Sequence, residues 1–126
     1  MDHVKILVVD DETDVQPLFE QRFRREIRKG ELSFSFAFSG EEALKYMEEH
    51  ASEVVLILSD INMPGMSGID LLKHIRRTHA SPNPRVMIIT AYNDNDYYNQ
   101  AISGGADDFL TKPLDFTLLK EKLSQL

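Results

Sequence analysis

Five polar side chains stand where short aliphatic runs of the sequence end. They are Asp10, Asp11, Asp60, Thr90 and Lys112. Three carboxylates brought together repel one another, so they need a proton or a cation, and Mg²⁺ is a cation that prefers oxygen ligands. Lys112 would then supply a positive charge for a second anionic group. Carboxylates, Mg²⁺, a lysine and a hydroxyl suit phosphoryl transfer, in which catalysis consists mainly of positioning and charge neutralisation.

These side chains can meet only if the aliphatic runs form strands of one sheet. The predicted strands are residues 6–9, 32–38, 54–58, 86–90 and 109–111, and helical patterns lie between them. Five strand–helix units in alternation predict an α/β fold, with a doubly wound parallel sheet and five helices on its two faces. Ligands of such sheets bind beyond the carboxyl ends of the strands, which is where the five polar side chains stand.

The apolar pattern also assigns places within this fold. Residues 54–58 form the most apolar strand and should be central, whereas the alternation over 32–38 predicts an edge strand solvated on one side. The first helix should run from Thr13 or Asp14 to about Lys29, where Gly30 ends it. Tyr98 fits the apolar stripe of a short helix and should join the core, whereas Tyr97 should be exposed and could contact a partner.

Composition narrows the classes of function. A chain of 126 residues suits one domain, and 21 Asp and Glu against 14 Lys and Arg give a net charge of −7. Nucleic acid and anionic membranes would repel such a chain, so we expect neither as a direct partner. The absence of cysteine excludes thiolate catalysis and fits a reducing compartment. No apolar run is long enough to span a bilayer and no export signal is present, so we expect a cytoplasmic protein.

Each polar residue also has an ordinary interpretation. An Asp pair after a strand is more often a turn or a helix cap than a metal site. Thr90 could be an unremarkable strand residue, and Lys112 a solvated charge. Their joint placement at four predicted strand ends favours a site over these separate interpretations.

The chain resembles the receiver domains of two-component response regulators over residues 1–126, as one domain. The motifs that carry the resemblance are Val8-Val9-Asp10-Asp11-Glu12, Ser39-Gly40-Glu41-Glu42-Ala43-Leu44, Asp60-Ile61-Asn62-Met63-Pro64-Gly65-Met66-Ser67-Gly68, Thr90-Ala91, Gly105-Ala106-Asp107-Asp108-Phe109 and Lys112-Pro113. The resemblance implies a flavodoxin-like fold, with strand order 2-1-3-4-5 and three αβα layers. It also implies that Asp60 accepts a phosphoryl group from a phosphohistidine of a sensor histidine kinase or a phosphotransfer protein.

The resemblance further implies the surroundings of Asp60. Asp11 should bind Mg²⁺ directly and Asp10 mainly through water, with Asp60 and the backbone carbonyl of Asn62 completing the protein ligands. Lys112 should pair with a phosphoryl oxygen, and the bond before Pro113 should be cis.

Further residues should contact or shield the phosphoryl group. The Thr90 hydroxyl should bond a phosphoryl oxygen, with help from the backbone N–H of Ala91. Tyr92 borders the site, and we expect its bulk to slow hydrolysis of the phosphoryl group. The domain would thus catalyse its own phosphorylation and dephosphorylation without being an enzyme acting on other substrates.

In this family, Thr90 and an aromatic residue, here Phe109, form a switch. When Thr90 moves toward the phosphoryl group, the ring turns inward and the surface of the fourth helix, fifth strand and fifth helix changes. That surface would control an effector domain or a downstream protein, and could form a homodimer. Phe109 lacks the hydroxyl of the more usual Tyr, and could also be an ordinary core residue.

Three other functions stay open at this point. A Mg²⁺-dependent phosphohydrolase would need an acid two residues after its nucleophile, where Asn62 stands. A nucleotide-binding fold would need a Gly-rich loop where Asp10-Asp11-Glu12 stands. A module that dimerises without phosphorylation would not need all five site residues. The sequence does not identify the kinase, the output, or whether the domain acts alone.

Overall fold

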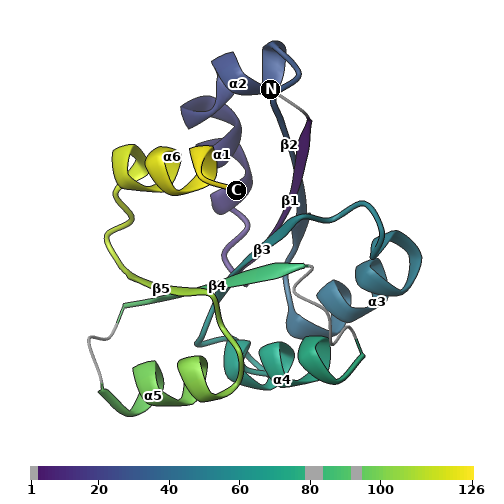
Figure 1. Ribbon diagram of the computed structural model, residues 1–126, viewed down its shortest axis with the longest axis vertical. Helices are drawn as coiled ribbons and strands as arrows, with labels where there is room; N and C mark the ends of the chain where they lie inside the picture. Colours follow the sequence, from purple (N-terminus) through teal and green to yellow (C-terminus); the bar gives the residue numbers. More distant parts are fainter. Residues whose placement is uncertain (1–2, 79–83, 92–94) are drawn as a thin grey trace.

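The computed structural model describes residues 3–78, 84–91 and 95–126. Its strands form one parallel sheet in the order β2-β1-β3-β4-β5, which confirms the predicted fold and strand order (Figure 1). The strands are β1 (Val4–Val9), β2 (Leu32–Ala37), β3 (Leu56–Asp60), β4 (Arg85–Thr90) and β5 (Asp108–Thr111). The central place of β3 is also confirmed, and every one of its residues is buried.

Six helices connect and follow the strands in the described residues, one more than the sequence predicted. They are α1 (Val15–Arg22), α2 (Arg24–Arg28), α3 (Gly40–His50), α4 (Gly68–Thr78), α5 (Asn95–Ser103) and α6 (Phe116–Ser124). Within the described part of the chain, none of them has the length and apolar character needed to cross a membrane.

The extra helix arises because the first predicted helix is broken at Phe23, so the prediction of one helix to Lys29 was wrong. The backbone of Phe23 leaves the helical region, with φ −110° and ψ 20°. Its ring is fully buried, and its centroid lies 5.1 Å from that of Phe34 and 5.9 Å from that of Phe116. This aromatic packing against the sheet and α6 fixes the chain direction in place of helical propensity. Gly30, with φ +76°, ends the segment as expected.

Helices cover both faces of the sheet, giving three layers (Figure 1). On one face, α1 and α6 pack against alternate strand residues such as Ile6, Val8 and Leu58. On the other face, α3, α4 and α5 pack against the intervening residues, among them Leu7, Ile57 and Ile88. The inner strands β1, β3 and β4 are therefore buried from both sides, as their continuous aliphatic runs predicted.

Strand β2 lies at the sheet edge as predicted, but both of its faces are partly covered, and neither is open to solvent along its length. Phe34 and Phe36 pack into the α1–α6 core. On the other face, Ser35 is half-buried and its hydroxyl lies 2.9 Å from the Tyr46 hydroxyl of α3. The prediction of a solvated face was wrong because small polar side chains on this strand leave room for a helix that brings its own hydroxyl.

Candidate functional site

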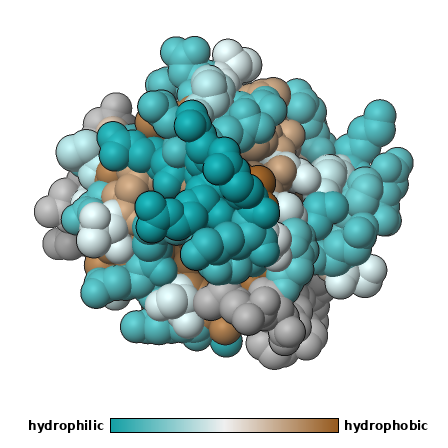
Figure 2. Space-filling model, turned by 90° about the horizontal axis from the view of Figure 1, so that it is seen from above, coloured by the Kyte–Doolittle hydropathy of each residue, from teal (hydrophilic) through white to brown (hydrophobic). Residues whose placement is uncertain are grey.

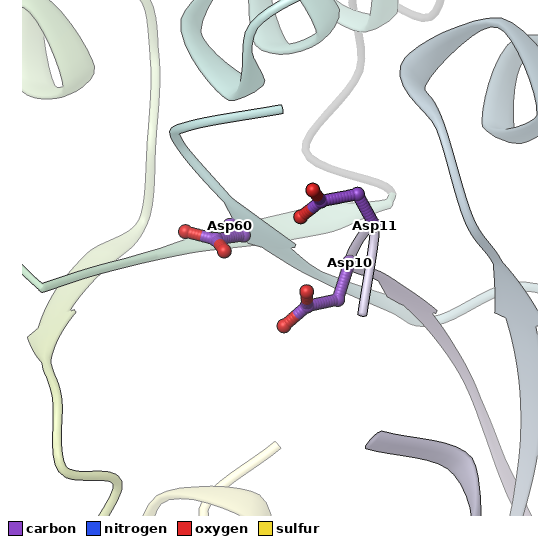
Figure 3. A group of neighbouring side chains, drawn as sticks. All are labelled: Asp10, Asp11 and Asp60. Atoms are coloured by element: carbon purple, nitrogen blue, oxygen red, sulfur yellow. The ribbon is translucent and has the colours of Figure 1, made fainter. Parts of the chain in front are cut away.

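Three carboxylates meet at the carboxyl edge of the sheet. Asp60 ends β3, Asp10 and Asp11 follow β1, and β1 and β3 are neighbours that pair Val9 with Ser59. Asp10, Asp11 and Asp60 each offer a carboxylate oxygen, and these oxygens lie within 4.8 Å of one another (Figure 3). The predicted convergence of these residues is thus present.

Lys112, the residue that follows β5, completes the cluster. Its ammonium donates a hydrogen bond to Asp60 Oδ2 at 3.0 Å and lies 3.9 Å from Asp10 Oδ2. Its backbone N–H donates to the carbonyl of Thr90 at 2.7 Å, and the Lys112–Pro113 bond is cis, as the resemblance implied. Partial burial lowers the pKa of Lys112, but the hydrogen bond and charge of Asp60, with the charges of Asp10 and Glu12, outweigh it and raise the pKa above its usual value.

The environment of Asp10 opposes the charge of its carboxylate. Its pKa is raised, chiefly by burial and further by the neighbouring charge of Asp60, although the Glu12 N–H donates to Asp10 Oδ1 at 3.0 Å and Lys112 lies nearby. Closely placed carboxylates, one with its charge disfavoured, form a donor set that a hard divalent cation would relieve. The residues present therefore fit Mg²⁺.

The backbone around Asp60 is closely packed by the loop that follows β3. Gly68 N–H donates to the carbonyl of Ile61 at 2.8 Å, and a β-carbon on Gly68 would lie only 2.1 Å from the carbonyl oxygen of Asp60. The hydroxyl of Ser59 donates to the same carbonyl at 3.0 Å. The sequence marked Gly68 only as part of a loop and a motif, and nothing in it indicated this contact or the role of Ser59.

The remaining predicted site residues lie at or just after the carboxyl ends of β3 and β4, which are neighbours in the sheet. Thr90 is the last residue of β4 and fully buried, and Ala91 follows it with an exposed side chain. Asn62 lies two residues after Asp60 and is exposed. Their contacts with a phosphoryl group or a metal stay predictions. Tyr92 lies outside the described residues, as does the side chain of Tyr97.

Phe109 and Tyr98 contact each other, and neither is fully buried in the core. Phe109 is partly buried and packs against the α3–α4–α5 core. Tyr98 does not join that core: it is 48% exposed, and its ring contacts Phe109 edge-on with centroids 5.5 Å apart. The prediction of a core Tyr98 was wrong because α5 turns Ala101, not Tyr98, toward the sheet.

A cavity of about 400 Å³ adjoins the cluster. Asp10, Asp60 and Lys112 line one part of it. Apolar side chains from α1 and from the segment after β5, including Leu18 and Pro113, line another. The cluster of Asp10, Asp60 and Lys112 therefore faces a cavity that has an apolar wall on one side.

A family model of the response regulator receiver domain matches residues 6–124 of this sequence. The chain belongs to this family. It is therefore a receiver domain of two-component signalling, the family that its motifs and the arrangement of Asp10, Asp11, Asp60 and Lys112 had indicated.

Known proteins similar to this receiver domain differ in length. The response regulator protein PilR of Pseudomonas aeruginosa is 37% identical over 96% of this chain, and the chemotaxis protein CheY of the same species is 30% identical over 98%. The chain covers 95% of CheY but only about a quarter of PilR, and 21% of a DNA-binding transcriptional regulator NtrC from Klebsiella pneumoniae.

Solved receiver domains share the fold. A response regulator receiver domain protein from Clostridium thermocellum superposes with a TM-score of 0.83 at 27% identity, over 97% of this chain and 92% of that one. The signal receiver domain of a LuxO repressor protein from Vibrio parahaemolyticus gives a TM-score of 0.82 at 30% identity, over 98% and 88%.

Proposed function

We propose that Asp60 accepts a phosphoryl group from a phosphohistidine of a sensor histidine kinase or a phosphotransfer protein. The observation that carries this proposal is the placement of Asp60 beside Asp10 and Asp11 and 3.0 Å from the ammonium of Lys112. A nucleophilic carboxylate between a cation site and a lysine has the charges that a transferring phosphoryl group needs around it. The domain, which we take to span residues 1–126, would catalyse this step on itself rather than on another substrate.

In the forward step, a carboxylate oxygen of Asp60 attacks phosphorus, and a P–O bond forms as the P–N bond of the phosphohistidine breaks. The imidazole nitrogen keeps the electron pair, and Asp60 becomes an aspartyl phosphate. To close the cycle, water attacks phosphorus, the P–O bond to Asp60 breaks, and the carboxylate is restored as inorganic phosphate leaves with the oxygen and protons of that water.

The neighbouring residues divide the work of neutralising charge. Asp10, Asp11 and Asp60, with the backbone carbonyl of Asn62, would hold Mg²⁺, which when bound neutralises charge on phosphoryl oxygens. Lys112 would leave its present pairing with Asp60 Oδ2 and pair with a second phosphoryl oxygen. The Thr90 hydroxyl and the Ala91 N–H would donate to a third.

The effect of phosphorylation would be transmitted through α5, β5 and α6. These are the fourth helix, fifth strand and fifth helix predicted from the sequence, because the first predicted helix is split into α1 and α2. Phosphorylation would draw Thr90 toward the phosphoryl oxygen and let Phe109 turn inward from its contact with Tyr98. The resulting surface would act on an effector domain or a downstream protein in the cytoplasm, without direct binding of this domain to nucleic acid or membrane.

The decisive experiment uses acetyl phosphate as a small phosphodonor. With Mg²⁺, intact-mass spectrometry should detect one added phosphoryl group that hydroxylamine removes, because an acyl phosphate reacts with this nucleophile. Asp60→Asn should abolish the adduct. Asp70→Asn, an exposed aspartate of α4, serves as the matched control and should keep it. An adduct that persists in Asp60→Asn would refute the assignment.

A second function has one supporting observation. Tyr98 and Ile102 of α5 are 48% and 44% exposed, and Leu118 of α6 is 42% exposed. Large exposed apolar side chains on this surface favour an interface, so the domain could form homodimers there without phosphorylation. Sedimentation without a phosphodonor tests this second function. If dimerisation does not need phosphorylation, wild type and Asp60→Asn should dimerise equally.

A further inference from the structure

A groove lined by cations lies between the C-terminal part of α1, α2 and α6. Its volume is about 890 Å³, and we call it the basic groove. Its basic residues are Arg22, Arg24, Arg25, Arg28, Lys29 and Lys120. Most of the groove lies toward the end of the sheet where β1 and β2 begin, because the end of α2 is joined by backbone hydrogen bonds to that segment, whereas Arg22 also lines the cavity beside Asp10 and Asp60. Figure 2 looks onto this end of the molecule and shows hydrophilic side chains gathered there.

The basic groove is opposite in charge to the rest of the chain. It holds six of the 14 Lys and Arg residues but only one of the 21 Asp and Glu residues, Glu26. The rest of the chain therefore has eight basic against 20 acidic residues. Such segregation produces a local positive potential on a negative protein, which is a basis for selecting an anionic partner.

The protein itself leaves most of these charges unpaired. Glu26, the acid in the groove, lies 3.4 Å from Lys120. Within residues 3–78, 84–91 and 95–126, the exposed Arg24, Arg25 and Arg28 form no ion pair. A cation in the last turn favours a helix, but that effect does not explain why six cations line one groove.

Two of the cations are held in place by aromatic rings. The Arg22 guanidinium lies 5.3 Å from the centroid of the Phe116 ring, and the Lys120 ammonium lies 5.4 Å from that of Phe23. Side chains fixed in this way lose less freedom when they bind an anion. The groove is thus partly ordered before any partner arrives.

We infer that the basic groove is a docking surface for a short acidic segment of a partner protein. Arginine matches carboxylates with paired hydrogen bonds, and four of the six cations are arginines. A segment that ends within the groove escapes the acidic remainder of the chain, whereas a nucleic acid continues past it and would be repelled. A membrane surface would meet the same repulsion, and two copies joined symmetrically would bring like charges together.

The test compares two triple variants with the same change in charge. Arg24→Gln, Arg25→Gln and Arg28→Gln remove three of the six positive charges of the groove and leave the ring-bound cations Arg22 and Lys120 unaltered. The control carries Lys73→Gln, Arg77→Gln and Arg85→Gln, which are exposed cations of α4 and β4. A third variant replaces the three groove arginines by lysine and keeps the charge. Circular dichroism and urea unfolding establish that each variant is folded.

The probe is a short fluorescein-labelled peptide rich in Glu, whose anisotropy is measured at low and at high salt. We expect wild type, the control and the lysine variant to bind the peptide at low salt. The glutamine groove variant should bind it at least about tenfold more weakly. A single-stranded oligonucleotide of equal charge and vesicles containing phosphatidylserine should bind more weakly than the peptide.

The opposite results overturn the inference. These are absence of peptide binding to wild type, equal weakening in the groove variant and the control, or tighter binding of the oligonucleotide or the vesicles than of the peptide. Acetyl phosphate should modify Asp60 equally in the groove variant and wild type, so failure of docking and failure of the proposed phosphorylation give different results.

Discussion

The α-carbon of Gly68 faces the backbone carbonyl of Asp60 so closely that a β-carbon would lie 2.1 Å from that oxygen. Real β-carbons do not approach a backbone oxygen to this distance, and the strand that holds Asp60 is fully buried and cannot move aside. Gly68 therefore lets α4 begin directly against the candidate nucleophile.

Gly68→Ala should destabilise the fold by about 1–3 kcal/mol or more, since it overpacks a rigid backbone contact. Urea unfolding measures this loss. Gly40→Ala is the matched control: its β-carbon would lie 2.9 Å from Met66 Cβ and Sδ, a much milder overlap than 2.1 Å, so the loss should be smaller. Equal losses in both variants would show that the Asp60 carbonyl is not the restraint.

Asp10→Asn should change how stability depends on pH in the presence of a chelator. The folded state raises the pKa of Asp10, so this residue contributes stability that is present below its unfolded pKa of about 3.9 and is lost as the pH rises through its folded pKa. The variant removes that loss. It should therefore be more stable than wild type at neutral pH, with the difference vanishing in acid. Glu49→Gln, which replaces an exposed acid of α3, is the matched control.

Mg²⁺ should stabilise the folded protein if the aspartate cluster binds it. At a free concentration of about 100 times the dissociation constant, linkage gives roughly 2.7 kcal/mol. Thermal unfolding with and without Mg²⁺ measures the effect, which should be strongly reduced in Asp11→Asn and retained in Glu48→Gln, an exposed acid of α3. An equal gain in both variants would place the ion elsewhere.

Arg76→Lys should destabilise the fold by about 1–3 kcal/mol. The guanidinium of Arg76 donates to the carbonyls of Gly105 and Pro84 at 2.9 and 2.7 Å and to Asp107 Oδ2 at 2.9 Å, and lysine cannot make all three bonds. Arg77→Lys, on the exposed side of the same helix, should change stability by less than about 0.5 kcal/mol. A small loss in Arg76→Lys would mean that these bonds are individually dispensable.

The strand pattern and the site were predictable from sequence for one physical reason. Parallel strands buried on both faces are continuous aliphatic runs, and the residues that end them must share one edge of the sheet. Asp10, Asp60 and Lys112 could therefore be brought together without coordinates. The direct pairing of Lys112 with Asp60 could not be predicted, because it depends on which of the neighbouring carboxylates lies nearest to the ammonium.

The errors came from positions that tertiary contacts decide. The spacing of Phe19, Phe23 and Ile27 continues a helical stripe, so only the packing of the Phe23 ring reveals that the helix ends there. Tyr98 lies on α5, and the burial of its side chain depends on how closely this helix approaches the sheet and which side it turns inward. The contact of Gly68 with Asp60 joins two segments whose approach no local pattern records.

Lys112 reaches Asp60 across 52 positions of the sequence, and a further 49 separate Asp60 from Asp11. Residues so far apart in the chain meet only when the strands that lead to them have paired, and each pairing requires closure of a long loop. A partly folded or truncated chain that lacks one of these strands therefore also lacks the assembled cluster of aspartates and lysine.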